Sequence, residues 1–146
     1  MKVVFQSGKG FYSFLIKLFT FGKYTHCGIV IDGILYQSVI GKGVYSKPWN
    51  PKGWTAKDIP VSHINKEDAK KFLIEEIGCG YDLIGVLHFI FFFLKPSKNK
   101  WFCSELASEA TIKAGFLNRK KKPCYFSSQS LFDTLEKKLN KNQRKV

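Results

Sequence analysis

The dipeptide Asp32-Gly33 is the feature that most constrains the fold, because it separates two apolar stretches, THCGIVI and ILYQSVI. Asp-Gly is a preferred two-residue hairpin turn, since both positions of that turn require positive φ. The pattern predicts antiparallel strands over 25–32 and 34–40. A two-residue turn also fixes the register of the hairpin, which places Gln37 opposite Gly28.

The remaining elements are predicted from the spacing of apolar residues and from turn residues. Further strands are expected at 2–6, near 43–47 and at 57–62, and helices at 11–21, 66–77 (with Asn65 as N-cap), 82–94, 102–115 and 128–140. Residues 141–146 are expected to form a basic, frayed tail. The chain of 146 residues is therefore expected to form one α+β domain over 1–146, with an antiparallel sheet or meander packed against helices.

The composition excludes global disorder, because 45% of the residues are hydrophobic and 16% are aromatic. Lys and Arg number 24 against 11 Asp and Glu, which gives a formal net charge of +13. So basic a surface favours anionic partners such as an anionic membrane, an anionic polymer or nucleic acid. Lysine is also a common solubilising residue, and the basic run at 119–122 is most simply explained as a solvated loop. The sequence does not establish an oligomeric state.

The apolar run at 83–94 is shorter than the ~20 residues that span a bilayer. A buried core helix is the simpler interpretation, and peripheral membrane contact through Phe91, Phe92 and Phe93 is the alternative. The N-terminus lacks the apolar core and cleavage site of a signal peptide. We therefore expect a cytoplasmic or otherwise reducing compartment, in which the four cysteines are free thiols. The cysteines and histidines lack metal-ligand spacing, so no metal or other cofactor is expected.

Three residues could together carry nucleophilic chemistry. Cys103 lies at the predicted start of a helix, where unpaired N–H groups and the helix dipole favour a thiolate. His26, near the start of a strand, is a candidate general base, and strand alternation turns Cys27 away from it into the core. Gln37 lies diagonal to His26 on the same face, where its amide could orient the imidazole.

Other residues are candidates for supporting roles around Cys103. Tyr24 is predicted to share the face of His26, and its hydroxyl could donate to an oxyanion, but a packed aromatic ring is the simpler interpretation. Ser104 and Glu105 follow the candidate nucleophile in the first turn of the helix, where a carboxylate stabilises the helix N-terminus. From residue types alone, a buried inert Cys103 and a core His26 remain the simpler interpretation.

Three motifs together resemble a known family. HCGIVI, then GCGYDLIGVL, then WFCSELASEA followed by AGF resemble the circularly permuted papain-like amidases, relatives of NlpC-type cell-wall peptidases and lecithin:retinol acyltransferases. In that group the His strand precedes the Cys helix, as it does over about residues 20–115 here. The resemblance implies a permuted papain-like fold with Cys103 as nucleophile and His26 as base. Gln37 takes the place of a third polar residue that is often His or Glu.

The expected function is therefore that of a thiol amidase or peptidase acting through an acyl-thioester. Its substrate would be a peptidoglycan stem peptide or another peptide-like linkage. One alternative is a lipid ester or amide hydrolase, or an acyltransferase, acting at membranes. The other is a non-catalytic basic module that binds nucleic acid, an interpretation that the resemblance disfavours.

Overall fold

The computed structural model describes most of the chain, namely residues 1–8, 22–82, 100–119 and 122–144. The helix expected over 11–21 lies outside these ranges. So does the helix expected over 82–94 from residue 83 onward, including Phe91, Phe92 and Phe93. Within the described ranges, no helix combines the length and the apolar character needed to cross a bilayer.

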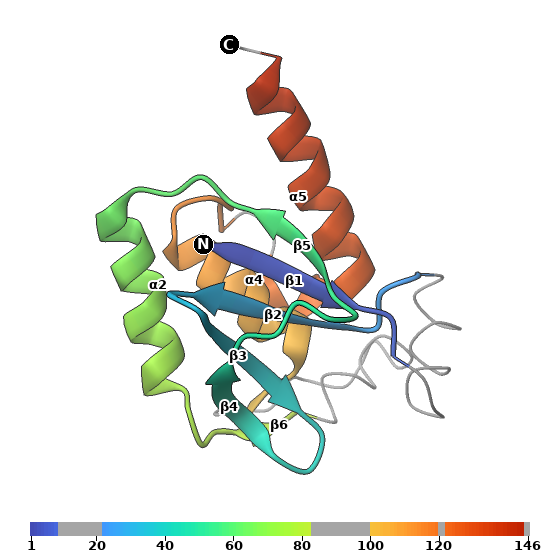
Figure 1. The fold of residues 1–146 in the computed structure, drawn as a ribbon, viewed down its shortest axis with the longest axis vertical. Helices are drawn as coiled ribbons and strands as arrows, with labels where there is room; N and C mark the ends of the chain where they lie inside the picture. Colours follow the sequence, from blue (N-terminus) through green and yellow to red (C-terminus); the bar gives the residue numbers. More distant parts are fainter. Residues whose placement is uncertain (9–21, 83–99, 120–121, 145–146) are drawn as a thin grey trace.

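A five-stranded antiparallel sheet forms the centre of the fold, with the strand order β4-β3-β2-β1-β5 (Figure 1). The strands are β1 (Lys2–Gln6), β2 (His26–Ile31), β3 (Ile34–Val39), β4 (Gly43–Pro48) and β5 (Thr55–Asp58). The antiparallel α+β architecture is as expected. The strand β5 begins earlier than predicted, and its pairing with β1 starts with Phe5 opposite Thr55. The start was missed because its polar sequence TAKD shows no alternation of apolar residues.

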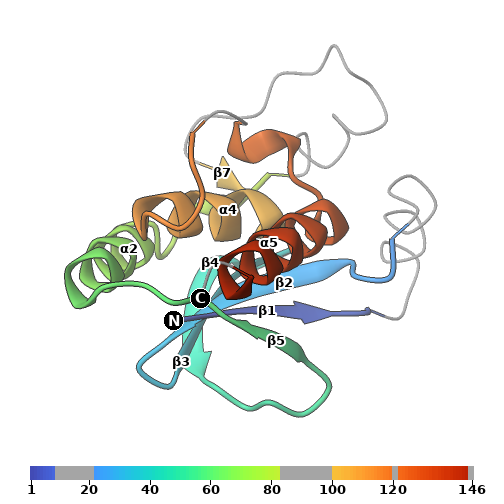
Figure 2. The same ribbon diagram turned by 90° about the horizontal axis from the view of Figure 1, so that it is seen from above.

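The helices lie on one face of the sheet (Figure 2). They are α2 (His63–Glu75), α4 (Cys103–Lys113) and α5 (Ser128–Gln143), and a short 3₁₀ helix, η1 (Pro123–Tyr125), comes before α5. Two short parallel strands, β6 (Gly80–Tyr81) and β7 (Lys100–Trp101), precede α4. The β7 strand leads directly into the first turn of α4.

Two helix ends differ from the predictions. The N-cap of α2 is Ser62 rather than Asn65, because the Ser62 hydroxyl accepts the Asn65 N–H at 3.2 Å. Ser127 caps α5, and the helix continues to Gln143 instead of fraying from residue 141. Lys141 lies in its last turn, where a cation interacts favourably with the helix dipole.

The β2–β3 hairpin has the predicted turn and register. Asp32 and Gly33 adopt φ of 50° and 76°, as a type I′ turn requires. Ile31 lies opposite Ile34, and the pairing continues back along both strands. The Asp32 carboxylate bonds Lys66 and Lys70 of α2 at 3.0 and 2.7 Å, and the Lys70 and Lys66 bonds lower its pKa to about 2. These ion pairs join the hairpin to α2.

The two faces of the sheet carry different packing. The main core lies between the sheet and the helices, and its fully buried members include Phe5, Ile29, Leu106 and Leu131. On the opposite face, a smaller cluster of Val4, Val30 and Leu35 is covered by Trp49 and Trp54, which come from the loop between β4 and β5. This loop therefore shields the face of the sheet that the helices leave uncovered.

Candidate active site

Gln37 and His26 are hydrogen-bonded, as the hairpin register predicts. The Gln37 Oε1 atom lies 2.8 Å from His26 Nε2. Gly28 makes this approach possible, because a Cβ at that position would lie 2.8 Å from a Leu35 methyl carbon and 2.9 Å from the Tyr36 carbonyl oxygen. The space at Gly28 is filled by residues of β3.

The orientation of the Gln37 amide is set by Tyr45, a residue that sequence reasoning missed. Gln37 Nε2 donates to the Tyr45 hydroxyl at 2.8 Å, and the two residues are direct cross-strand partners on β3 and β4. This contact turns the amide oxygen toward His26, so the His26 Nε2 atom must carry a proton. The other ring nitrogen, Nδ1, is then the one left to exchange a proton with a thiol.

The first residue of α4, Cys103, lies beside the His26 ring. The two side chains interact closely enough for each to shift the pKa of the other, and this places the N-terminus of α4 near the start of β2. Burial of the ring lowers the pKa of His26. The interactions with Cys103 and the hydrogen bond to Gln37 raise this pKa by more than burial lowers it, so the net shift is upward. The Cys103 side chain is only 5% exposed. The two residues expected to act together are thus in contact.

Cys103 also contacts Cys27 and Ser128, two partners that were not predicted. The Ser128 hydroxyl lies 3.7 Å from Cys103 Sγ and donates to Cys27 Sγ at 3.6 Å. Strand alternation correctly placed Cys27 in the core. Its proximity to Cys103 was not predicted, because that proximity depends on how α4 and α5 pack on this face of the sheet. Ser128 begins α5, so its approach to β2 depends on tertiary packing alone.

These contacts give the Cys103 thiol a pKa well below its ordinary value. The largest cause is a hydrogen bond from Cys27; burial acts in the opposite direction, and the hydrogen bond and charge of His26 and the contact with Ser128 lower the pKa further. Burial, together with the neighbouring Cys103, raises the pKa of Cys27 well above the usual range. Cys27 therefore keeps its proton and donates it to the Cys103 thiolate. The downward shift at Cys103 and the upward shift at His26 together favour a thiolate–imidazolium pair.

The first turn of α4 supplies backbone N–H groups next to the sulfur. The first intrahelical bond runs from Leu106 N–H to Phe102 O at 3.1 Å, so the N–H groups of residues 103–105 precede the helical ladder. Such groups can stabilise an oxyanion on a carbonyl bound at Cys103. The predicted position of Cys103 at a helix N-terminus is confirmed.

Ser104 and Glu105 hold this helix start in place. The Ser104 hydroxyl donates to the carbonyl oxygen of Phe126, just before α5. The Glu105 carboxylate accepts the Phe102 N–H, but burial and then the charges of Asp82 and Glu109 raise its pKa to about 7. Both side chains therefore have structural contacts that position α4.

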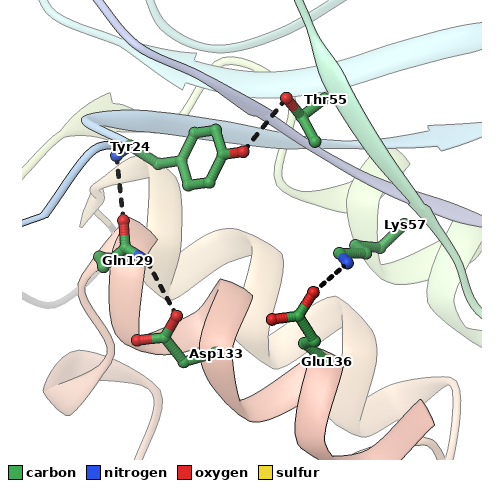
Figure 3. A network of polar contacts seen from close by, with 6 residues as sticks. All are labelled: Tyr24, Thr55, Lys57, Gln129, Asp133 and Glu136. Carbon is green, nitrogen blue, oxygen red and sulfur yellow. Dashed lines mark hydrogen bonds and ion pairs between the residues drawn. The ribbon is translucent and has the colours of Figure 1, made fainter. Parts of the chain in front are cut away.

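Tyr24 lies elsewhere than predicted. Its hydroxyl donates to Thr55 Oγ1 at 3.2 Å, and its backbone N–H bonds Gln129 of α5 (Figure 3). The ring packs against Phe5 and Phe132 in the main core. Alternation does not extend back to Tyr24 because β2 begins only at His26, so the two side chains do not share a face.

In the described part of the chain, Tyr81 and Trp54 are two further aromatic residues that lie near Cys103 and His26. Tyr81 on β6 pairs with Trp101, two residues before Cys103. Burial, followed by the charges of Cys103 and Cys27, raises the Tyr81 pKa, so its hydroxyl stays protonated. The Trp54 ring lies 5.6 Å from the His26 ring between centroids. The sequence gave no signal for Trp54, which lies in a loop.

No model of a known protein family matches the chain, and no curated protein sequence matches it significantly.

Proposed function

We propose that this protein is a cysteine hydrolase of the permuted papain-like type that cleaves an amide bond through an acyl-thioester. The observation that carries the proposal is the contact between Cys103, whose pKa lies well below its ordinary value, and His26, whose other nitrogen is held by Gln37. A nucleophile, a base and an orienting group in that order are the requirements of thiol acyl transfer.

The reaction begins with the proton of Cys103 on His26. The thiolate attacks the carbonyl carbon of the substrate, and the N–H groups at the start of α4 stabilise the oxyanion that forms. Tyr24, whose hydroxyl donates to Thr55 and whose ring packs in the main core, does not supply a side-chain donor in this role. The imidazolium then protonates the leaving amine, and a water molecule activated by His26 hydrolyses the thioester.

Gln37 and Tyr45 keep the imidazole in one orientation throughout this cycle. An amide oxygen accepts the Nε2 proton in both the neutral and the charged states of His26, so the ring need not turn between steps. Gln37 carries no charge, so it orients the imidazolium without stabilising it as strongly as a carboxylate would. The thiolate is stabilised mainly by Cys27 and His26.

The substrate class that we favour is a peptidoglycan stem peptide or another peptide-like linkage. The test incubates the purified protein with stem peptides and measures the release of new amino groups, with acid quenching to trap a thioester on Cys103 for mass spectrometry. Cys103→Ala should abolish both signals. Cys124→Ala is the matched control, because this cysteine lies in η1 and should leave both signals unchanged.

The same preparation distinguishes the alternatives. Fatty acid release from vesicles of anionic phospholipid, without peptide cleavage, would overturn the amide assignment but keep the Cys103 mechanism. If neither substrate is cleaved, and duplex DNA binds with a steep salt dependence that Cys103→Ala leaves unchanged, then the hydrolase proposal fails. The net charge of +13 would then have its function in nucleic-acid binding.

A further inference from the structure

The cluster of Cys27, Cys103 and Ser128 brings two thiols together inside the protein. The Ser128 hydroxyl oxygen lies 3.7 Å from Cys103 Sγ and 3.6 Å from Cys27 Sγ, and the two thiols shift each other's pKa in opposite directions. None of the four cysteines is in a disulfide in this structure. Catalysis by Cys103 and His26 does not require a second thiol as reactant, so this contact has a separate chemical consequence.

We propose that Cys27 is a resolving cysteine, which forms a reversible disulfide with Cys103 after a hydroperoxide has oxidised Cys103. The inference depends on the contact between the two thiols and does not require that the protein hydrolyses any substrate. The geometry favours the bond, because the two sulfurs lie 3.7 and 3.6 Å from the same Ser128 hydroxyl oxygen, and a shift of the side chains toward each other would bring them to the ~2 Å of a disulfide.

The two steps balance as follows. The Cys103 thiolate attacks one oxygen of hydrogen peroxide, the O–O bond breaks, and the released hydroxide takes up a proton to become water. Cys103 is thereby oxidised to a sulfenic acid and the peroxide is reduced. The Cys27 sulfur then attacks Cys103 Sγ, the S–O bond breaks, and the hydroxyl leaves as water with the Cys27 proton.

The roles of the two cysteines follow from their surroundings. Cys103 is the sulfur that peroxide oxidises, because it is held as a thiolate and retains 5% exposure, whereas Cys27 is fully buried. A buried partner that cannot meet peroxide itself acts only on an oxidised Cys103. Such a disulfide would protect Cys103 from irreversible oxidation to sulfinic acid.

The other two cysteines provide matched controls. The Cys79 thiol donates to Glu76 Oε2 at 3.2 Å, and Cys124 lies in η1. Both are partly buried thiols whose pKa burial raises, and neither lies in the cluster of Cys27, Cys103 and Ser128. Cys79→Ser and Cys124→Ser should therefore leave the reaction unchanged.

The test treats the full chain with hydrogen peroxide, alkylates the remaining thiols and maps the peptides by mass spectrometry without reduction. The wild-type protein should lose two of its four free thiols and about 2 Da, in a linked peptide pair that contains Cys27 and Cys103. Dithiothreitol should restore all four thiols. In Cys27→Ser, Cys103 should gain about 32 Da as sulfinic acid, which dithiothreitol does not reverse.

Two results would overturn the inference. One is a wild-type protein in which Cys103 reaches sulfinic acid as fast as in Cys27→Ser. The other is a linked peptide that joins Cys103 to Cys79 or Cys124. Circular dichroism establishes that Cys27→Ser is folded, and the wild-type peptide map decides the matter on its own if the variant does not fold.

Discussion

Removing the imidazole of His26 should raise the pKa of Cys103 by about 1–2 units. A hydrogen bond to a charged group contributes about 1.5–3 kcal/mol, and 1.36 kcal/mol corresponds to one pKa unit. The shift should not restore the ordinary value, because the hydrogen bond from Cys27, the largest cause of the low pKa, remains in His26→Ala. His63→Ala is the matched control, since His63 is exposed at the start of α2.

The assay is the rate of iodoacetamide modification of Cys103 as a function of pH, with each thiol followed by peptide mass spectrometry. Only the thiolate reacts, so the rate rises through the pKa of Cys103. Burial raises the pKa of the other three thiols, so Cys103 should be modified first at neutral pH. In His26→Ala the midpoint should move upward by the 1–2 units derived above.

The rate below both midpoints should fall less than the thiolate fraction does. A rise of 1–2 pKa units lowers the thiolate fraction about 10- to 100-fold. The more basic thiolate is a better nucleophile, and its rate constant rises by about half a power of ten for each pKa unit. The net loss should therefore be about 3- to 10-fold. An unchanged midpoint in His26→Ala, an equal shift in His63→Ala, or equally slow labelling of all four thiols would refute the reasoning.

Three further substitutions test separate contacts. Tyr45→Phe leaves the Gln37 N–H without its acceptor, which should lower the free energy of unfolding by about 1–3 kcal/mol and reduce any acyl-transfer rate, measured by chemical denaturation and by thioester formation. Glu105→Gln should stabilise the protein by about 1–3 kcal/mol at pH 8.5 but not at pH 4. The raised pKa of the Glu105 carboxyl means that the wild-type protein loses stability as pH rises through about 7. Chemical denaturation at both pH values will measure this difference. Gly28→Ala should destabilise by about 1–3 kcal/mol, because the new methyl group meets Leu35 and the β3 backbone; its melting temperature will show this.

Each substitution has an outcome that contradicts it. Equal stability of Tyr45→Phe and the wild type would mean that water replaces the lost acceptor. If Glu105→Gln gained the same stability at both pH values, ionisation of the Glu105 carboxyl would not be the cause of the gain. Glu75→Gln, at an exposed position of α2, is the control for this substitution. A Gly28→Ala variant of wild-type stability would mean that β3 shifts freely, and the His26–Gln37 contact would then not be fixed by packing.

The hairpin and the relation of Gln37 to His26 could be predicted because they depend on local sequence. A two-residue turn determines which residues pair, and that pairing brought Gln37 to His26 as expected. The position of Cys103 at a helix N-terminus also follows from local pattern. Proximity of Cys103 to His26 came only from a resemblance, because no local pattern relates the two residues.

The remaining contacts depend on packing between distant segments. Ser128 and Cys27 are 101 residues apart, and Trp54 reaches His26 from a loop without periodic pattern. Tyr45 was within reach of prediction, since extending the register from β3 to β4 pairs it with Gln37. The error at Tyr24 came from extending strand alternation beyond the point at which β2 begins.

The use of Gln rather than a carboxylate at position 37 is consistent with the way charge is distributed in this site. A carboxylate there would add a second buried anion near the Cys103 thiolate, and partly satisfied buried charges cost several kcal/mol. A neutral amide avoids that cost, and Cys27 stabilises the thiolate instead through a hydrogen bond. Stabilisation of the ion pair thus comes mainly from the sulfur side. It follows that Cys27→Ala should raise the pKa of Cys103 at least as far as Gln37→Ala does, and the pH profile of alkylation described above measures both.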